Sequence, residues 1–114
     1  MCRAYLTPWK DPETKEYVSI GRCNIGAVSL NLPLIFKASK GNFWEELMVN
    51  LEQIREFLKR RYDMIKHAKA STNPMAFCQG GFYKGFLKPE DEVGELTKYM
   101  TASFGISALN EFAI

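Results

Sequence analysis

The sequence is poor in the residues that build metal sites and disulfide frameworks. Its 114 residues include three cysteines, Cys2, Cys23 and Cys78, and a single histidine, His67. The cysteines are odd in number, widely spaced and without a CxxC pair, so they predict neither a secreted disulfide scaffold nor a zinc site. We interpret them as reduced thiols, of which at least one is buried.

Long apolar runs and an excess of either charge are also missing. The most apolar stretch, residues 25–36, is shorter than the about 18 residues that span a bilayer and contains Asn31 and Pro33. The first ten residues lack the apolar core of a signal peptide. Fifteen basic and thirteen acidic residues give a net charge of +2, too balanced for a dedicated nucleic-acid binder. We expect a cytoplasmic protein that binds neither membranes nor nucleic acid.

The common catalytic motifs are absent as well. Gly80, Gly81 and Gly85 belong to neither a GxGxxG nor a GK[ST] phosphate loop, and we interpret them as turn glycines. No HExxH motif occurs, and one histidine offers little basis for a Ser-His-Asp triad. The hydrophobic fraction of 46% and charged fraction of 25% are those of an ordinary globular domain. Function must therefore be sought in local patterns.

The first third of the sequence has the pattern of extended chain. Residues 1–22 favour a ribbon whose centre, 10–15, has turn chemistry, and residues 17–20 favour a returning strand. Residues 27–32 alternate like a strand, and Pro33 should end its hydrogen-bond ladder.

A long helix is predicted from about residue 43 to residue 68. Asn42 with Glu45 is typical of a helix N-terminus, and Glu56 can pair weakly with Arg60 one turn later. The apolar side chains recur at helical spacing and form one stripe: Leu47, Leu51, Ile54, Leu58 and Ile65.

The remaining residues continue the alternation of strands and helices. Residues 75–78 are a short apolar, strand-like run, and a second helix is expected to start at Pro89. Residues 102–106 favour a buried strand and residues 107–112 the opening of another helix. This order predicts an α/β fold. Because the strands are too few for a complete parallel sheet, we interpret the chain as an arc of a larger barrel or sheet.

Four blocks, in order along the chain, resemble segments of one enzyme family. They are CRAYL with Pro8-Trp9 at residues 2–9, GRCNIGAVSLNLP at 21–33, NPMAFCQGGFY at 73–83 and ASFGISALNE at 102–111. Together they are similar to anaerobic (class III) ribonucleoside-triphosphate reductases, nearly from end to end. One departure is Leu34, where many members have arginine after the NLP triplet; here it would extend the apolar strand.

The resemblance implies a fold and an activity. These enzymes reduce ribonucleoside triphosphates to the deoxyribonucleotides needed for DNA replication, by thiyl and glycyl radical chemistry without oxygen. Residues 1–114 would then be a fragment of the catalytic barrel domain, a partial arc of a ten-stranded α/β barrel with an N-terminal loop that carries Cys2. Neither an ATP-binding regulatory domain nor a C-terminal glycyl-radical domain is expected in this sequence, so the piece alone should be inactive.

The same resemblance implies roles for three residues. Cys2 matches the cysteine that becomes a thiyl radical and takes hydrogen from C3′ of the ribose; sulfur suits this role because it stabilises an unpaired electron. Asn24 matches an asparagine near that cysteine, where a neutral amide can bind a ribose hydroxyl, although a plain turn residue is an equal alternative. Glu111 could supply protons for the loss of water, against the alternative of a solvated helix residue. For Cys23 no role is expected, and for Cys78 burial is favoured over a reductant role.

Several cofactors and partners follow from the resemblance. The glycyl radical would come from a segment absent from this sequence, and zinc and ATP or dATP effector sites are expected only in the full-length protein. The partners would be a ribonucleoside triphosphate, the remainder of the reductase chain and a radical-SAM activating protein, with a homodimer as the intact enzyme.

Two other functions remain open at this stage. The chain could be a binding or interaction module derived from such a reductase, which would dock on the whole enzyme, whereas a fragment would regain activity only with its flanking pieces. It could also belong to another glycyl-radical enzyme, although the NLP and NPMAF blocks argue against that.

Overall fold

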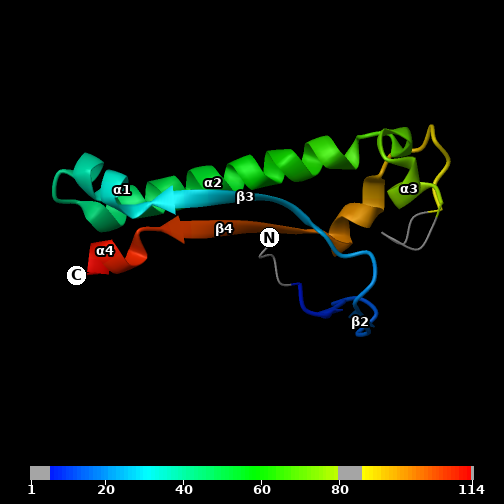
Figure 1. Cartoon of the computed structure of the whole chain (residues 1–114), viewed down its shortest axis with the longest axis horizontal. Helices are drawn as coiled ribbons and strands as arrows, with labels where there is room; N and C mark the ends of the chain where they lie inside the picture. The colour runs from blue at the N-terminus through cyan, green and yellow to red at the C-terminus, as the bar shows by residue number, and fades with distance from the viewer. Residues whose placement is uncertain (1–5, 80–85, 114) are drawn as a thin grey trace. The chain divides into compact units, whose positions relative to one another are not determined.

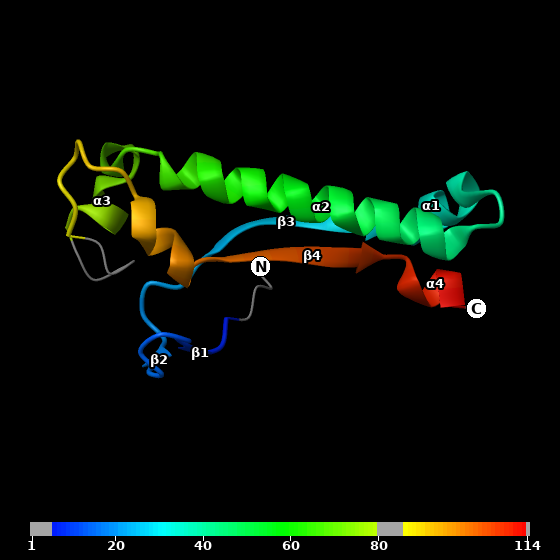
Figure 2. The ribbon, with the colours of Figure 1, turned by 180° about the vertical axis from the view of Figure 1, so that it is seen from behind.

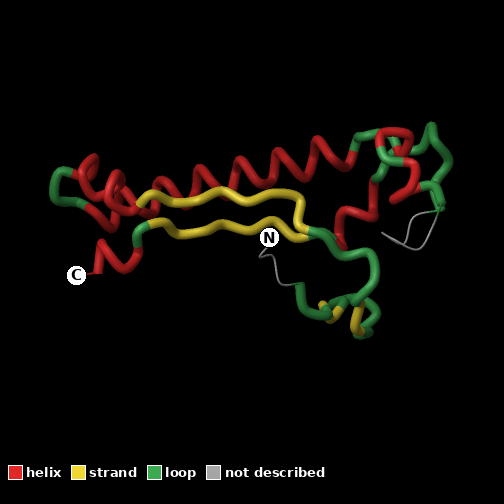
Figure 3. Tube along the Cα trace, viewed as in Figure 1, coloured by secondary structure: helices red, strands yellow, loops and turns green. Residues whose placement is uncertain are grey.

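The computed structural model describes residues 6–79 and 86–113, so the glycines at 80, 81 and 85 lie outside the described residues. Both strands and helices occur along these residues, in a mixed α/β arrangement, which confirms the predicted class at this level (Figures 1 and 3). The chain forms two compact units. The first unit contains Met1–Ile25 and Arg61–Thr101, and the second contains Gly26–Arg60 and Ala102–Ile114. Each unit is described by itself.

A small hairpin opens the described part of the first unit. Strands β1 (Trp9–Lys10) and β2 (Tyr17–Val18) pair antiparallel, with Trp9 opposite Val18. Asp11 closes the turn, because its carboxylate accepts the backbone N–H of Glu13 at 2.8 Å. The predicted ribbon with a central turn is confirmed, although the returning strand ends before Ile20.

The core of the first unit lies where residues 89–93 pair with residues 68–71, which follow the end of α2 (Phe43–Lys66). The N–H of Ala70 donates to the Asp91 carbonyl at 2.8 Å, and the N–H of Val93 donates to the Ala68 carbonyl at 2.9 Å. These bonds hold the two segments together over a cluster of five buried side chains: Ala70, Ala76, Phe77, Val93 and Met100.

The helix predicted to start at Pro89 is wrong. Its place is taken by a turn at residues 89–90, an isolated bridge between Glu92 and Lys69, and a 3₁₀-helix, η2 (Gly94–Tyr99). Gly94 has a φ of +55°, outside the right-handed helical region, so a regular α-helix from Pro89 cannot continue through it. Val93 before η2 and Met100 after it are both buried.

The strand-like run predicted at residues 75–78 is also wrong. A 3₁₀-turn, η1 (Ala70–Thr72), leads into the short helix α3 (Pro74–Phe77). The Asn73 side chain caps α3 by accepting the N–H of Ala76 at 3.3 Å, and Pro74 occupies the first turn, where no N–H is needed.

The second unit is built on a sheet of β3 (Asn24–Asn31) and β4 (Thr101–Ser107). The two arrows point the same way, so the pair is parallel (Figures 1 and 2). A Cβ at Gly105 would stand 3.1 Å from the Ser29 hydroxyl, so the missing side chain lets the strands approach closely. Both strands were predicted, but β4 is not buried among the described residues, since Phe104 is 54% exposed.

A short helix that the sequence did not predict follows β3. Helix α1 (Leu32–Ser39) has Pro33 in its first turn, and the Asn31 side chain caps it by accepting the N–H of Leu34 at 3.2 Å. Pro33 therefore ends the strand, as expected, by starting a helix. The expectation that Leu34 extends the strand is wrong, because Leu34 lies on α1 and is exposed.

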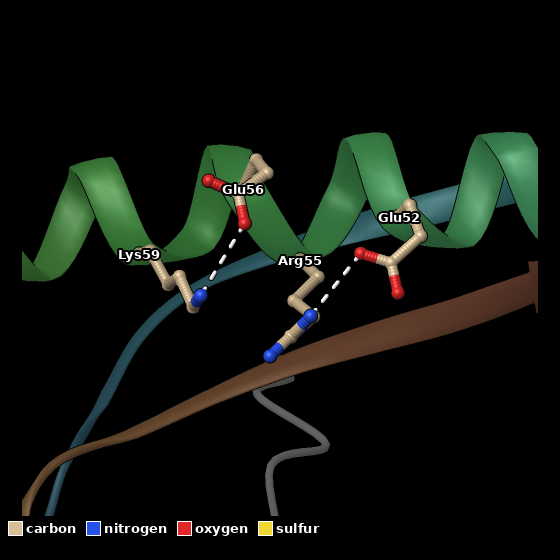
Figure 4. A network of polar contacts seen from close by, with 4 residues as sticks. All are labelled: Glu52, Arg55, Glu56 and Lys59. Carbon is tan, nitrogen blue, oxygen red and sulfur yellow. Dashed lines mark hydrogen bonds and ion pairs between the residues drawn. The ribbon is translucent and has the colours of Figure 1, made fainter.

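The long helix is confirmed as α2, which ends at Lys66, two residues before the predicted boundary. The predicted stripe is half-buried throughout, while Met48, Val49 and Phe57 lie off it and are exposed. On the polar side Glu52 pairs with Arg55 at 3.2 Å, and Glu56 pairs with Lys59 at 3.3 Å rather than with Arg60 (Figure 4).

Aromatic side chains join the helices of the second unit. The ring of Phe112 on α4 (Leu109–Ala113) stacks on Phe43, with centroids 4.8 Å apart, and meets Phe36 edge-on at 5.7 Å. An apolar cavity of about 290 Å³ lies beside this cluster; its lining comes from β3, α1, α2, β4 and α4 and includes Leu30, Leu32, Leu47, Leu51, Phe104 and Ile106.

Candidate functional site

The cysteine at position 2 lies outside the described residues. The structure does describe the ribbon that follows in the sequence, residues 6–18. It also describes the residues that hold this ribbon in the first unit.

Arg22 is the main link between the ribbon and the rest of the first unit. Its guanidinium donates from Nη1 to the Thr7 carbonyl, from Nη2 to the Thr101 hydroxyl at 2.6 Å and from Nε to the Tyr99 carbonyl at 3.4 Å. A planar guanidinium suits this arrangement, since its five N–H groups are fixed in one fork.

Two further contacts hold the same ribbon to residues 98 and 99. The Lys98 ammonium lies 3.8 Å from the Asp11 carboxylate and 3.7 Å from that of Glu13. The Trp9 and Tyr99 rings meet edge to face, 6.2 Å between centroids. The ribbon is therefore fixed at its start, its first strand and its turn.

The Asp11 carboxylate is the most buried charged group among the described residues, with Asp11 3% exposed. The backbone N–H of Glu13 holds its pKa below the usual value, and Lys98 acts in the same direction, while burial opposes both. Asp11 therefore stays ionised although it is buried.

Asn24 is half-buried and is the first residue of β3. Its neighbour Cys23 fixes this point, because the Cys23 carbonyl accepts the N–H of Thr101 at 2.7 Å. Burial raises the pKa of the Cys23 thiol, so Cys23 is protonated at neutral pH and is a poor nucleophile.

Glu111 lies in the first turn of α4, in the second unit, and is exposed. Asn24 belongs to the first unit and Glu111 to the second, and Cys2 lies outside the described residues. Their roles stay predictions.

The other titratable side chains that the sequence singled out, Cys78 and His67, make contacts of a structural kind. Cys78 is half-buried and packs on the core of the first unit. His67 Nδ1 lies 3.1 Å from the Glu92 carboxylate on the surface. Among residues 6–79 and 86–113, His, Cys, Asp and Glu side chains form no group of three that could hold a metal ion. No helix in this part of the chain has the length and apolar character needed to cross a membrane.

A parallel strand pair joined through a long helix defines the second unit as a piece of an α/β fold. The family model of the anaerobic ribonucleoside-triphosphate reductases matches residues 1–114, and the chain belongs to this family.

Three relatives carry the name anaerobic ribonucleoside-triphosphate reductase. The chain is 34% identical to the protein of Salmonella typhimurium and 33% to that of Escherichia coli K12, in each case over 92% of its own length. It is 35% identical to the protein of Enterobacteria phage T4 over 99% of its length. The chain spans only 15–20% of the length of these relatives.

The sequence analysis missed the residues that hold the ribbon. Arg22 was recognised only as part of the GRCN block, Asp11 only as a turn residue, and Lys98 was given no role. The GR pair at the end of an extended segment was the available signal, but the sequence does not reveal that Arg22 meets Thr7 and Thr101, which lie 15 and 79 residues away.

Proposed function

We propose that these 114 residues are a segment of the catalytic barrel of an anaerobic ribonucleoside-triphosphate reductase, and that β3 and β4 are two of the ten barrel strands. The observation that carries this proposal is the family match over residues 1–114, which includes the block around Cys2. The parallel pairing of β3 and β4 supports it, because parallel strands linked by helices are the repeating unit of α/β barrels.

In this proposal Cys2 is the radical carrier. Its thiyl form takes a hydrogen atom from C3′ of the ribose, so that an S–H bond forms, the C3′–H bond breaks and the unpaired electron moves to the sugar carbon. The sugar radical loses its 2′-hydroxyl as water, and a reductant, either formate or a thiol protein, supplies the two electrons and the further proton that put hydrogen at C2′. The first hydrogen atom then returns to C3′, which regenerates the thiyl. A glycyl radical on a segment outside this sequence supplies the initial oxidation of the thiol.

Asn24 and Glu111 would assist this chemistry in different ways. The Asn24 amide can hydrogen-bond a ribose hydroxyl without adding charge, and its place at the start of β3 fixes its backbone. Glu111 would donate the proton that lets the 2′-hydroxyl leave as water, and its exposure in the described chain leaves it open to substrate.

The intact enzyme would be a homodimer in the cytoplasm, activated by a radical-SAM protein. The nucleotide effector and zinc sites of such an enzyme would belong to segments other than these 114 residues. The segment alone would therefore be inactive, and nucleotide reduction by the purified 114-residue polypeptide would contradict the proposal.

The proposal is tested by substitution in the native reductase chain, activated and assayed without oxygen. We expect Cys2→Ala to abolish reduction of ribonucleoside triphosphates, whereas Cys78→Ala, the matched control, should keep most of the activity because Cys78 packs on the core. Glu111→Gln should lower kcat by about 100-fold or more if Glu111 is the general acid. Turnover by the Cys2→Ala enzyme would overturn the role of Cys2.

The size of the native product tests the domain assignment. We expect peptide mapping from the native cells to find residues 1–114 in a polypeptide several times larger than 13.1 kDa, with peptides beyond Ile114. A native product of about 13.1 kDa that binds an intact reductase would favour the interaction-module alternative.

A further inference from the structure

We propose that Thr101 is a positioning residue for the Asn24 amide. Its backbone N–H and its hydroxyl hold Cys23 and Arg22, the two residues that precede Asn24, so Thr101 sets the backbone from which the amide projects. This inference rests on the proposed role of Asn24, the binding of a ribose hydroxyl. Thr101 itself need not touch substrate.

The first argument is that one contact of Thr101 ends on the peptide group of Asn24 itself. Both residues belong to the first unit, and the Thr101 N–H donates to the Cys23 carbonyl at 2.7 Å. That carbonyl, the Asn24 nitrogen and the Asn24 Cα lie in one plane, because a peptide bond does not rotate freely. A hydrogen bond that fixes this plane therefore fixes the point from which the Asn24 side chain leaves the backbone.

The second argument is the bond that the Thr101 side chain adds one residue earlier. The Arg22 guanidinium donates from Nη2 to the Thr101 hydroxyl at 2.6 Å and from Nε to the Tyr99 carbonyl at 3.4 Å. Hydrogen bonds from a charged donor are stronger than neutral ones. Arg22 and Cys23 are thus both tied to Thr101, so the chain is held over the two residues before Asn24.

The third argument is the place of these contacts at the end of two strands. Asn24 is the first residue of β3 and Thr101 is the first residue of β4. Strand ends open more readily than strand centres, so this position needs support. The support is firm on the Thr101 side, because the preceding residue, Met100, is buried and its carbonyl accepts the Tyr62 hydroxyl at 2.7 Å.

The proposed chemistry makes the placement of the Asn24 amide important. An amide carries a donor on one side and an acceptor on the other, and a hydrogen bond weakens steeply when its angle falls below about 120°. A displacement of about 1 Å in an active site can cost about 100-fold in rate. Even a smaller shift of the backbone at Asn24 should therefore be measurable in turnover.

The test is Thr101→Val in the native reductase chain, activated and assayed without oxygen. Valine keeps the branched shape and the backbone N–H but lacks the hydroxyl, and we expect kcat/KM to fall about tenfold. Thr101→Ser keeps the hydroxyl and should keep most of the activity. Thr72→Val is the matched control, because the Thr72 hydroxyl donates to the Lys69 carbonyl at 2.7 Å elsewhere in the first unit. It loses a comparable bond and should leave kcat/KM unchanged.

A double-mutant cycle separates positioning from general damage to the fold. Asn24→Ala should lower kcat/KM by about tenfold or more, because a hydrogen bond to the ribose is lost. If Thr101 acts through Asn24, adding Thr101→Val to Asn24→Ala should lower kcat/KM by no more than about twofold further.

Hydrogen exchange of peptide 100–107 reports the strand end directly and should rise about fivefold in Thr101→Val. Arg22→Lys removes the guanidinium fork without changing Thr101, and should show the same exchange and the same dependence on Asn24. This second variant tests the inference even if Thr101→Val fails to fold.

The outcomes distinguish this inference from the proposed function. If Asn24→Ala is impaired but Thr101→Val is fully active or leaves exchange unchanged, only the inference fails. Equal losses from Thr101→Val with and without Asn24 would also overturn it, because Thr101 would then act on the fold alone. A fully active Asn24→Ala would contradict the proposed role of Asn24, and the inference with it. A loss that depends on Asn24 and is absent from Thr101→Ser supports the inference.

Discussion

At the scale of single residues, Asp11 is a turn residue whose charge also contributes to holding the ribbon. Aspartate before proline is ordinary turn chemistry, and the sequence predicts no more than that for Asp11. In the structure its buried carboxylate accepts the Glu13 N–H and faces Lys98. A buried carboxylate with these partners favours the ionised form, so the hairpin depends on charge at this position.

This dependence predicts how the ribbon responds to acid. Because the folded pKa of Asp11 lies below its ordinary value of 3.8, its contribution to stability is present above about pH 4 and is lost as pH falls through the lowered pKa. In the native chain, Asp11→Asn should speed hydrogen exchange of peptide 6–18 at pH 6, after correction for intrinsic rates. The difference from wild type should shrink only as pH falls below 3.8 and through the lowered pKa of Asp11, since protonated Asp11 also lacks the charge.

Asp63→Asn provides the control for this comparison. Asp63 is an exposed carboxylate on α2, so its substitution should leave peptide 6–18 unchanged throughout this pH range. Equal exchange of peptide 6–18 in Asp11→Asn and wild type at pH 6 would contradict the role assigned to the Asp11 charge.

Single residues also show which parts of the candidate site can be predicted from the sequence and which cannot. Cys2, Asn24 and Glu111 could be named because each lies in a block with a family resemblance. Arg22 lies in such a block too, but its hydrogen bonds end on Thr7, Tyr99 and Thr101, and no local pattern encodes contacts across 77 or 79 residues. The chemistry of a side chain can be read from its residue type, whereas its long-range contacts can be read only from the folded structure.

At the scale of elements, periodicity predicted α2 well because a 24-residue helix repeats its pattern many times. The segment after Pro89 offered too few turns for that test. Proline followed by acidic residues is typical of a helix start, but the backbone of residues 89–93 is bonded to residues 68–71 instead. Such long-range pairing overrides local preference. The short helices α1 and α3 were missed for a related reason, because helices of eight and four residues carry little periodicity.

Substitution of Gly94 distinguishes the observed conformation from the predicted α-helix, because the change in stability has opposite signs in the two. With φ at +55°, Gly94→Ala should destabilise this segment by about 1–2 kcal/mol, the cost of an L-residue in the left-handed region. No described atom lies within 4 Å of the added Cβ, so the cost is conformational. In the α-helix that the sequence predicted, the same change would stabilise by about 1 kcal/mol.

The measurement is the free energy of local opening from hydrogen exchange of residues 87–101 in the native chain. Gly94→Asn is the companion variant, because asparagine tolerates the left-handed region better than alanine and should cost less. A stabilising Gly94→Ala would show that the segment is helical after all.

At the scale of the whole molecule, the second unit exposes more apolar surface than a free-standing domain normally does. Half or more of the surface of several large side chains is open in the described chain, on α1, α2, β4 and α4: Leu34, Phe36, Trp44, Met48, Val49, Phe104 and Leu109. The two-stranded sheet also has an unpaired edge on each side, within the part of the chain that the structure describes. Both features fit a segment that packs against further parts of a larger reductase.

These features predict that the 114-residue polypeptide associates when it is produced alone. In reducing buffer we expect light scattering after size exclusion to show oligomers that grow with concentration, because exposed apolar faces and strand edges have no partners. Met48→Lys should raise the monomer fraction, since Met48 is 58% exposed on α2. Gln53→Lys adds the same charge at an exposed polar position of that helix and should change little. A wild-type monomer with a sharp thermal transition would contradict the prediction and show that these 114 residues form a self-sufficient domain.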